Sequence, residues 1–147
     1  MAIIDRLPTR DRLARMSIGM DRGCVLCGLD EKSRNHIFGD CPYACRVWDV
    51  VLQACRLPCR LRGWEDNLTW LICNLRGNFL IVCILKIAWT NFLYFIWEER
   101  NFIIFRGVER SLEVVYGKIK DIVCSRLFGY FFKQDGVNLQ LCEDWGC

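Results

Sequence analysis

The sequence lacks several patterns on which enzymes depend. Its 147 residues include only one histidine, and they contain neither a glycine-rich phosphate loop nor a G-x-S-x-G motif. These absences exclude a P-loop nucleotide site and a serine nucleophile of the G-x-S-x-G type. Adjacent carboxylates such as Glu98 and Glu99 point in different directions from a helix, so we interpret them as solvated. We therefore expect no enzymatic activity from this chain.

No export signal opens the chain, because Met1–Ile4 is short and is followed by Asp5, Arg6 and Pro8. For the 11 cysteines, metal ligation or simple burial is therefore favoured over disulfides, and their odd number argues against a complete disulfide framework. We expect a nuclear or cytoplasmic protein that is not secreted. The abrupt start, which completes no apolar face, also suggests a fragment of a longer chain.

The composition is that of one folded domain. Hydrophobic residues make up 53% of the chain and aromatic residues 13%, which is too much for a disordered segment. The net charge is +3, and residues 1–62 hold 11 Lys and Arg against 7 Asp and Glu. This imbalance suits either a solvated arginine-rich helix face or a surface that contacts phosphates, and it is too small to choose between them.

The spacing of apolar residues predicts a mainly α-helical fold. The expected helices are Thr9–Ile18, a helix from Pro42 to Pro58, Trp64–Leu75, Asn78–Arg106 and Ser111–Phe128. The tail from Lys133 is expected to be irregular. Residues 20–41 show neither helical nor strand periodicity, and a segment of this length without a core of its own needs another source of order.

The stretch Phe79–Trp97 is apolar nearly all round and is long enough to span a membrane. Lys86, Thr90 and Asn91 lie in its middle and oppose this interpretation, since a central Lys costs about 2.5–3.5 kcal/mol on insertion scales. We therefore favour a buried core helix over a membrane helix. A strand over the early β-branched run is the least favoured alternative.

One group of residues carries recognisable chemistry. Cys24, Cys27, His36 and Cys41 follow the spacing C-x2-C, eight residues, H, four residues, C. Three thiolates and one imidazole suit Zn²⁺, which takes four nitrogen or sulfur ligands in a tetrahedron. Because Cys41 directly precedes Pro42, its thiolate would lie at a helix N-terminus, where the helix dipole favours an anionic sulfur.

We predict that these four residues bind one structural Zn²⁺. Four protein ligands leave no open position on the ion, and no second histidine remains for a Cys–His catalytic pair. The alternative is chance clustering in a cysteine-rich chain, and Cys45 and Cys55 are the substitutes if Cys41 is not the fourth ligand. The predicted fold is thus a small, mainly α-helical domain with an irregular CCHC zinc-binding loop between its first two helices.

Several segments also carry a family resemblance. They are Leu7-Pro-Thr-Arg-Asp-Arg-Leu13, Cys24-x-x-Cys27-Gly28, Lys32-Ser-Arg-Asn-His36-Ile-Phe38, Cys41-Pro42 and Val47-Trp48. In this order they resemble the zinc-binding domain of plant non-LTR (LINE-type) retrotransposon reverse transcriptases. Ile96-Trp97-Glu-Glu-Arg-Asn101 with Phe105 is similar to the family's IW-x-ERN-x-x-x-F helix, which usually lies before a ribonuclease H domain.

The chain departs from this family at two positions of the loop. Lys32 stands where the family usually has Glu, and Gly39 stands where it often has Phe. We expect these changes to weaken the apolar anchor of the loop without changing the ligand set. On the resemblance, residues 1–62 are the zinc-binding module, residues 63–130 its helical C-terminal part and residues 131–147 an irregular tail.

The resemblance implies an accessory domain that lies C-terminal to an RNA-directed DNA polymerase domain and contacts nucleic acid, either the element's RNA or its target DNA. The chain has no Asp-Asp pair of the kind a polymerase needs, so it is expected to be non-catalytic. Ordinary surface arginines are the alternative to phosphate contacts. The candidate phosphate contacts are Arg10, Arg12, Arg15, Arg34 and Arg46.

Two other functions stay open. In the first, the chain is a protein-interaction or scaffold module whose helix from Phe79 to Phe105 packs on a polymerase domain upstream. In the second, residues 79–97 make it a single-span membrane protein, although a membrane is the less favoured partner.

Overall fold

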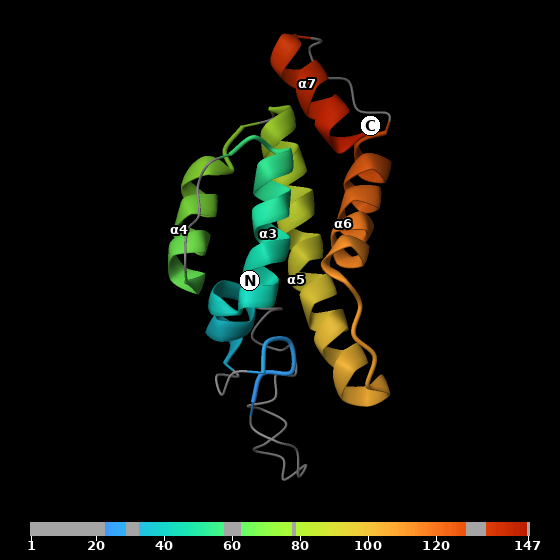
Figure 1. Cartoon of the computed structure of the whole chain (residues 1–147). Coiled ribbons are helices and arrows are strands. Elements are labelled where there is room, and N and C mark those ends of the chain that lie inside the picture. Colours follow the sequence, from blue (N-terminus) through green and yellow to red (C-terminus); the bar gives the residue numbers. More distant parts are fainter. Residues whose placement is uncertain (1–22, 29–32, 58–62, 78, 129–134, 147) are drawn as a thin grey trace.

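The computed structural model describes residues 23–28, 33–57, 63–77, 79–128 and 135–146, and over these residues the protein is helical without strands. The prediction of a mainly α-helical fold is therefore confirmed. Thr9–Ile18, the first three candidate arginines and Lys32 lie outside the described residues. The elements, with the labels of Figure 1, are a short π-helix η1 (His36–Asp40), α3 (Pro42–Ala54), α4 (Trp64–Asn74), α5 (Leu80–Arg106), α6 (Leu112–Leu127) and α7 (Gly136–Trp145).

The long helix α5 organises the bundle. It packs against α3 and α6 along its sides, against α7 near one end and against η1 near the other. Figure 1 shows α4 and α6 on opposite flanks, with α7 at the end of the molecule that lies away from η1. The segment that carries the Cys and His residues thus sits at one end of the bundle, before the main helices.

The length of α5 agrees with the sequence prediction. Its 27 residues correspond to about 40 Å of helix, and it ends at Gly107, whose φ of 64° is the left-handed conformation that favours glycine. By length and composition α5 could cross a membrane, yet more than half of its apolar 18-residue stretch is buried inside the protein. This burial agrees with the interpretation as a core helix.

A column of aromatic rings joins four elements. Phe38 of η1 lies 6.0 Å from Trp64 of α4, and Trp64 lies 5.9 Å from Trp89 of α5. The Trp89 ring meets Trp48 of α3 at 5.0 Å, and Phe92 lies 5.2 Å from the same Trp48. Each such pair contributes about 0.5–1.5 kcal/mol beyond the burial of its area. The column therefore fixes η1 to the bundle.

The tail contains a helix, so the prediction of an irregular tail is wrong for residues 136–145. Asp135 is the N-cap of α7, and its side chain accepts a hydrogen bond from the N–H of Asn138 at 2.9 Å. Gly146 ends the helix with a φ of 70°, and Leu141 and Trp145 are buried. These two apolar positions are too few to predict a helix from the sequence. The contact of α7 with α3 and α5 is what buries them.

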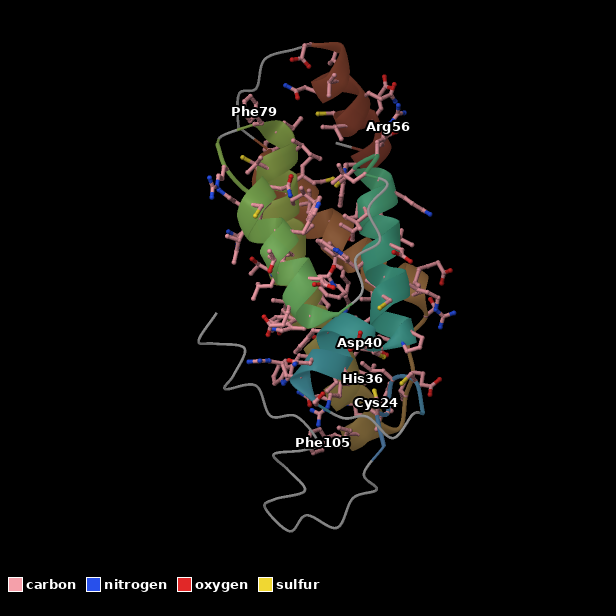
Figure 2. All side chains as sticks on the ribbon, turned by 90° about the vertical axis from the view of Figure 1, so that its left-hand side faces the viewer. Cys24, His36, Asp40, Arg56, Phe79 and Phe105 are labelled. Carbon is pink, nitrogen blue, oxygen red and sulfur yellow. The ribbon has the colours of Figure 1, made fainter. Side chains whose placement is uncertain are left out.

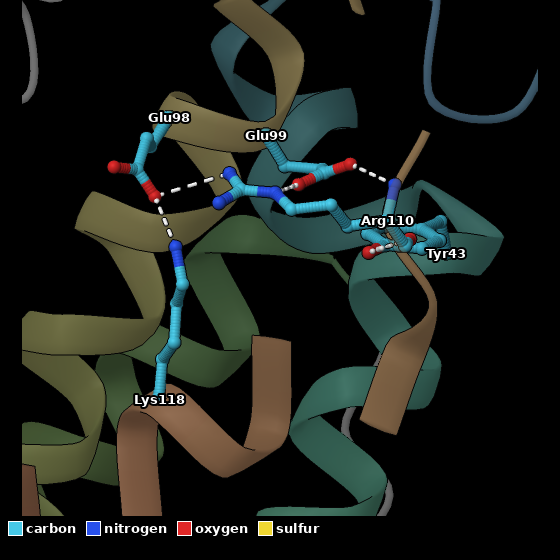
Figure 3. Close-up of polar contacts among 5 residues, drawn as sticks. All are labelled: Tyr43, Glu98, Glu99, Arg110 and Lys118. Carbon is cyan, nitrogen blue, oxygen red and sulfur yellow. Dashed lines mark hydrogen bonds and ion pairs between the residues drawn. The ribbon is translucent and has the colours of Figure 1, made fainter. Parts of the chain in front are cut away.

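The expectation that Glu98 and Glu99 are solvated is wrong for Glu99, which is 0% exposed. Its carboxylate accepts hydrogen bonds from the N–H of Arg110 at 2.7 Å and from Arg110 Nε at 2.5 Å (Figure 3). Glu98 accepts from Arg110 Nη2 at 3.1 Å and from Lys118 Nζ at 3.2 Å. The Tyr43 hydroxyl donates to the carbonyl of Arg110 at 3.2 Å. This network joins α3, α5 and α6.

Candidate metal centre

The first two cysteines lie on a tight turn. Gly28 closes it by donating its N–H to the carbonyl of Cys24 at 2.8 Å, and its φ of 76° is a conformation that glycine adopts without strain. The N–H groups of Leu26 and Cys27 hydrogen-bond to the Cys24 sulfur and help to lower its pKa. The turn therefore directs backbone donors at a sulfur, which stabilises a thiolate.

The other two residues of the group are joined by the π-helix η1. His36 begins it, and the N–H of Cys41 donates to the carbonyl of His36 at 2.6 Å. This i→i+5 bond places the two residues one wide turn apart, as π-helices often do at functional sites. Residues 36–40 are therefore not irregular as expected, and a 3.6-residue periodicity could not have revealed them.

Cys41 is the N-cap of α3, with Pro42 at the start of the helix, which confirms the predicted helix start. Its backbone is extended, with ψ at 122°, and its carbonyl accepts the first bond of the helix from Cys45 at 2.8 Å. The N–H of Ala44 hydrogen-bonds to the Cys41 sulfur. The backbone N–H groups in the first turn of a helix have no partner within the helix, so they are available to the Cys41 sulfur. Pro42 has no N–H and therefore leaves no unsatisfied donor at its own position.

The structure brings Cys24, Cys27, His36 and Cys41 together in one group. One ligand atom from each residue lies within 4.8 Å of the others, and Cys27 Sγ is 3.2 Å from His36 Nε2. Sulfurs around a tetrahedral zinc are about 3.8 Å apart, given a Zn–S distance of about 2.3 Å. Figure 2 shows Cys24 and His36 side by side at the end of the molecule away from Arg56. The donor set and its spacing fit one zinc ion.

The electrostatics of the group also favour a cation. The Cys41 thiol donates a hydrogen bond to Cys24, and this bond, opposed by burial, lowers the pKa of Cys24 to about 4. The same hydrogen bond and burial raise the pKa of Cys41 far above its usual range. Two buried neighbouring sulfurs thus share one proton because they cannot both be anionic alone. A divalent cation would replace that proton and allow all the sulfurs to ionise.

Neither alternative fourth ligand belongs to the group. Cys45 Sγ donates to the carbonyl of Gly39 at 3.3 Å. Cys55 lies at the far end of α3, where burial raises the pKa of its thiol to about 12. Cys124 of α6 is disulfide-bonded, although metal ligation or simple burial was expected for the cysteines.

The described candidate arginines have different surroundings. Arg34 is half-buried, its guanidinium lies 5.5 Å from the centre of the Trp64 ring, and it donates to the side chain of Asn35 at 3.3 Å. Arg46 is exposed on the second turn of α3. Of these two, Arg46 is therefore the better placed to meet a phosphate, whereas Arg34 covers the aromatic column.

Gly39 is a contact residue that sequence reasoning misread. The N–H of Gly63 donates to the carbonyl of Gly39 at 3.3 Å, and a Cβ on Gly39 would lie 2.3 Å from the backbone N of Trp64. The expectation that this glycine weakens the apolar anchor is wrong, because Ile37 and Phe38 are buried and supply that anchor. The glycine lets the start of α4 sit directly on η1.

Comparison with known proteins agrees with this geometry. Residues 1–48 match a protein family described as zinc-binding in reverse transcriptase, and the match includes all members of the Cys and His group. The resemblance to the zinc-binding domain of reverse transcriptases is thus confirmed over these residues. No curated protein and no solved structure matches the chain.

Proposed function

We propose that the chain is a non-catalytic accessory module of a plant non-LTR retrotransposon reverse transcriptase, built around one structural Zn²⁺. The observation that carries this proposal is the group of three sulfurs and one imidazole inside the matched residues 1–48. Cys24, Cys27, His36 and Cys41 would hold the ion. Four protein ligands leave no position for water or substrate, so the ion would support the fold.

The role of the ion follows from what its ligands join. Cys24 and Cys27 belong to the N-terminal turn, His36 begins η1, and Cys41 caps α3. The π-helix η1 contacts α3, α4 and α5, so the ion would hold the turn against the bundle. Free energy of metal binding is then part of the free energy of folding.

We propose nucleic acid, either RNA or target DNA, as the ligand of this module, in the nucleus or cytoplasm and beside a polymerase domain. The excess of Lys and Arg over Asp and Glu in residues 1–62 supports this, as does the exposed Arg46 near the metal centre. The matched family supports it further, because a reverse transcriptase works on nucleic acid.

The test is the zinc content of the purified protein, measured for the wild type and for Cys24→Ser and His36→Ala. We expect one zinc per chain in the wild type, and loss of both zinc and helix content in the two variants. Cys73→Ser is the matched control, since Cys73 is exposed on α4 and outside the group, and it should keep its zinc. A well-folded wild type without zinc would refute the proposal.

A scaffold role is the second candidate function. Phe79, between α4 and α5, is 72% exposed, and Ile72 on α4 is 62% exposed. A contiguous patch of exposed apolar side chains is typical of a surface that another protein covers, and we propose that these two residues belong to such a patch, here covered by the upstream polymerase domain. This role predicts association of the isolated chain that Ile72→Ser and Phe79→Ser relieve, as measured by light scattering.

A further inference from the structure

The C-terminal end of α5 gathers aromatic and basic side chains outside the metal centre. The guanidinium carbons of Arg106 and Arg110 lie 4.8 and 4.3 Å from the centre of the same Phe102 ring. One residue before Arg106, Phe105 exposes 73% of its surface. We call Phe102, Phe105 and Arg106 the α5 end cluster.

The two arginines over Phe102 differ in their partners. Arg110 is held by ion pairs to Glu98 and Glu99. Arg106 is exposed and has no carboxylate partner in the part of the chain that the structure describes. The aromatic ring positions its planar guanidinium without neutralising it. An arginine that is already oriented loses less side-chain freedom when it meets a phosphate.

The neighbouring Phe105 offers an exposed π face and no hydrogen-bonding group. Nucleic-acid bases stack on such rings with about 1–3 kcal/mol per base, whatever the base is. A single strand presents its base faces freely, whereas a duplex keeps them stacked in its interior. An exposed phenylalanine beside an arginine that has no carboxylate partner among the described residues therefore fits a single strand better than a duplex.

The cluster lies at the same end of the molecule as the metal centre. Figure 2 shows Phe105 at the same end of the molecule as Cys24 and His36, with Phe79 at the opposite end. Tyr43, two residues after Cys41, donates its hydroxyl to the carbonyl of Arg110, whose guanidinium lies over the Phe102 ring, and these contacts join the two sites. A strand bound at the metal-bearing end would therefore reach the cluster without crossing the bundle.

We infer that the α5 end cluster binds single-stranded nucleic acid, with a base stacked on Phe105 and a phosphate bound by Arg106. This inference rests on the proposed nucleic-acid function and adds to it the form of the ligand and a place outside the matched residues 1–48. A protein partner at this surface is the competing occupant, and the experiment distinguishes the two.

The experiment measures fluorescence anisotropy of labelled oligo-uridylate and oligo-thymidylate with the zinc-loaded chain. Phe105→Ala should weaken binding by roughly 5- to 150-fold, the equivalent of one lost stacking contact of about 1–3 kcal/mol. Arg106→Gln should also weaken it and should lower the slope of log affinity against log salt by about 0.7, one phosphate on a single strand. Comparison of the two probes distinguishes RNA from DNA.

The chain supplies matched controls at its other end. At the end of α6 that contacts α7, Phe128 is 92% exposed and Arg126 is also exposed, so Phe128→Ala and Arg126→Gln remove side chains of the same two types. Both controls should bind like the wild type. Zinc content and helix content, measured for every variant, show whether each has folded.

The outcomes separate the inference from the proposed function. If the wild type binds single strands and the variants at Phe105 and Arg106 bind equally well, the inference is wrong and the proposed function stands. Equal weakening at both ends, or binding to duplex alone, also overturns it. If the wild type binds no nucleic acid at all, both the inference and the nucleic-acid part of the proposed function fail, and a protein partner is favoured.

Discussion

Replacing Glu99 by alanine is expected to lower the free energy of unfolding by about 3–5 kcal/mol, the range for breaking one partner of a buried ion pair. Glu99 is fully buried, and both oxygens of its carboxylate accept bonds from Arg110. The side chain of Arg110 is 16% exposed. After the substitution the guanidinium of Arg110 would keep Glu98 as its one carboxylate partner among the described residues, and the backbone N–H of Arg110 would lose its acceptor.

Two further variants separate the contribution of the Glu99 charge from that of its hydrogen bonds. Glu99→Gln keeps an oxygen that can accept from the N–H of Arg110, but it presents an uncharged amide to Nε. Glu99→Gln should therefore lower the free energy of unfolding by less than Glu99→Ala does. The double variant Glu99→Leu with Arg110→Leu removes both charges and fills the space with apolar atoms. Its loss of stability should be smaller than the sum of the losses measured for Glu99→Leu and Arg110→Leu separately.

The assay is urea unfolding followed by circular dichroism at neutral pH with zinc present. Glu109→Ala is the control, because Glu109 is exposed beside Arg110, and it should change the free energy of unfolding by about 0.5 kcal/mol at most. A loss below about 1 kcal/mol for Glu99→Ala, or strict additivity in the double variant, would show that the network is not a coupled buried unit.

Two further predictions concern packing and pH. Gly39→Ala should lower the free energy of unfolding by about 1–3 kcal/mol, because the new methyl group would meet the backbone of Trp64. Gly117→Ala in α6 should raise it by about 0.5–1 kcal/mol, because a Cβ there meets nothing within 4 Å. Thermal unfolding measures both, and equal shifts of the same sign would contradict the contact. Burial, then the charge of Glu99, raises the pKa of Tyr43 from 10.0 to about 12. The native state therefore holds this proton more tightly, so its contribution is complete below pH 10 and is lost as the pH rises to about 12. Tyr43→Phe should flatten the fall in stability over that interval in urea unfolding, and parallel curves for the two proteins would refute this.

The helices were predictable where a 3.6-residue pattern runs long enough. Those that begin near Pro42, Trp64 and Leu112 follow from apolar periodicity, and α5 follows from a long apolar run that contains neither Gly nor Pro. The end of α3 was less predictable, because the helix stops at Ala54 and not at Pro58. Arg56 has a φ of 57° and its Nε pairs with Asp144 of α7 at 2.6 Å, a partner far along the chain. Local pattern does not contain such contacts.

The grouping of the metal-ligand candidates was predictable because spacing limits it. A C-x2-C turn and a histidine near a further cysteine can meet without help from distant segments. The residues that position this group were not predictable. Gly39 contacts Gly63 and Trp64, and Glu99 binds Arg110 across a helix end. Both are close approaches between elements, and a single glycine or carboxylate carries no periodic signal.

The metal centre and the helical bundle share one core. Cys24 and Cys41 are buried in the same hydrophobic cluster as Trp89 of α5 and Trp145 of α7. Phe38, in the π-helix between His36 and Cys41, begins the aromatic column that crosses α4, α5 and α3. A change that releases η1 therefore exposes rings of the bundle itself. Because these contacts form together, the metal should be released and the bundle should unfold in one cooperative transition. The ion would then stabilise helices that contribute none of its ligands.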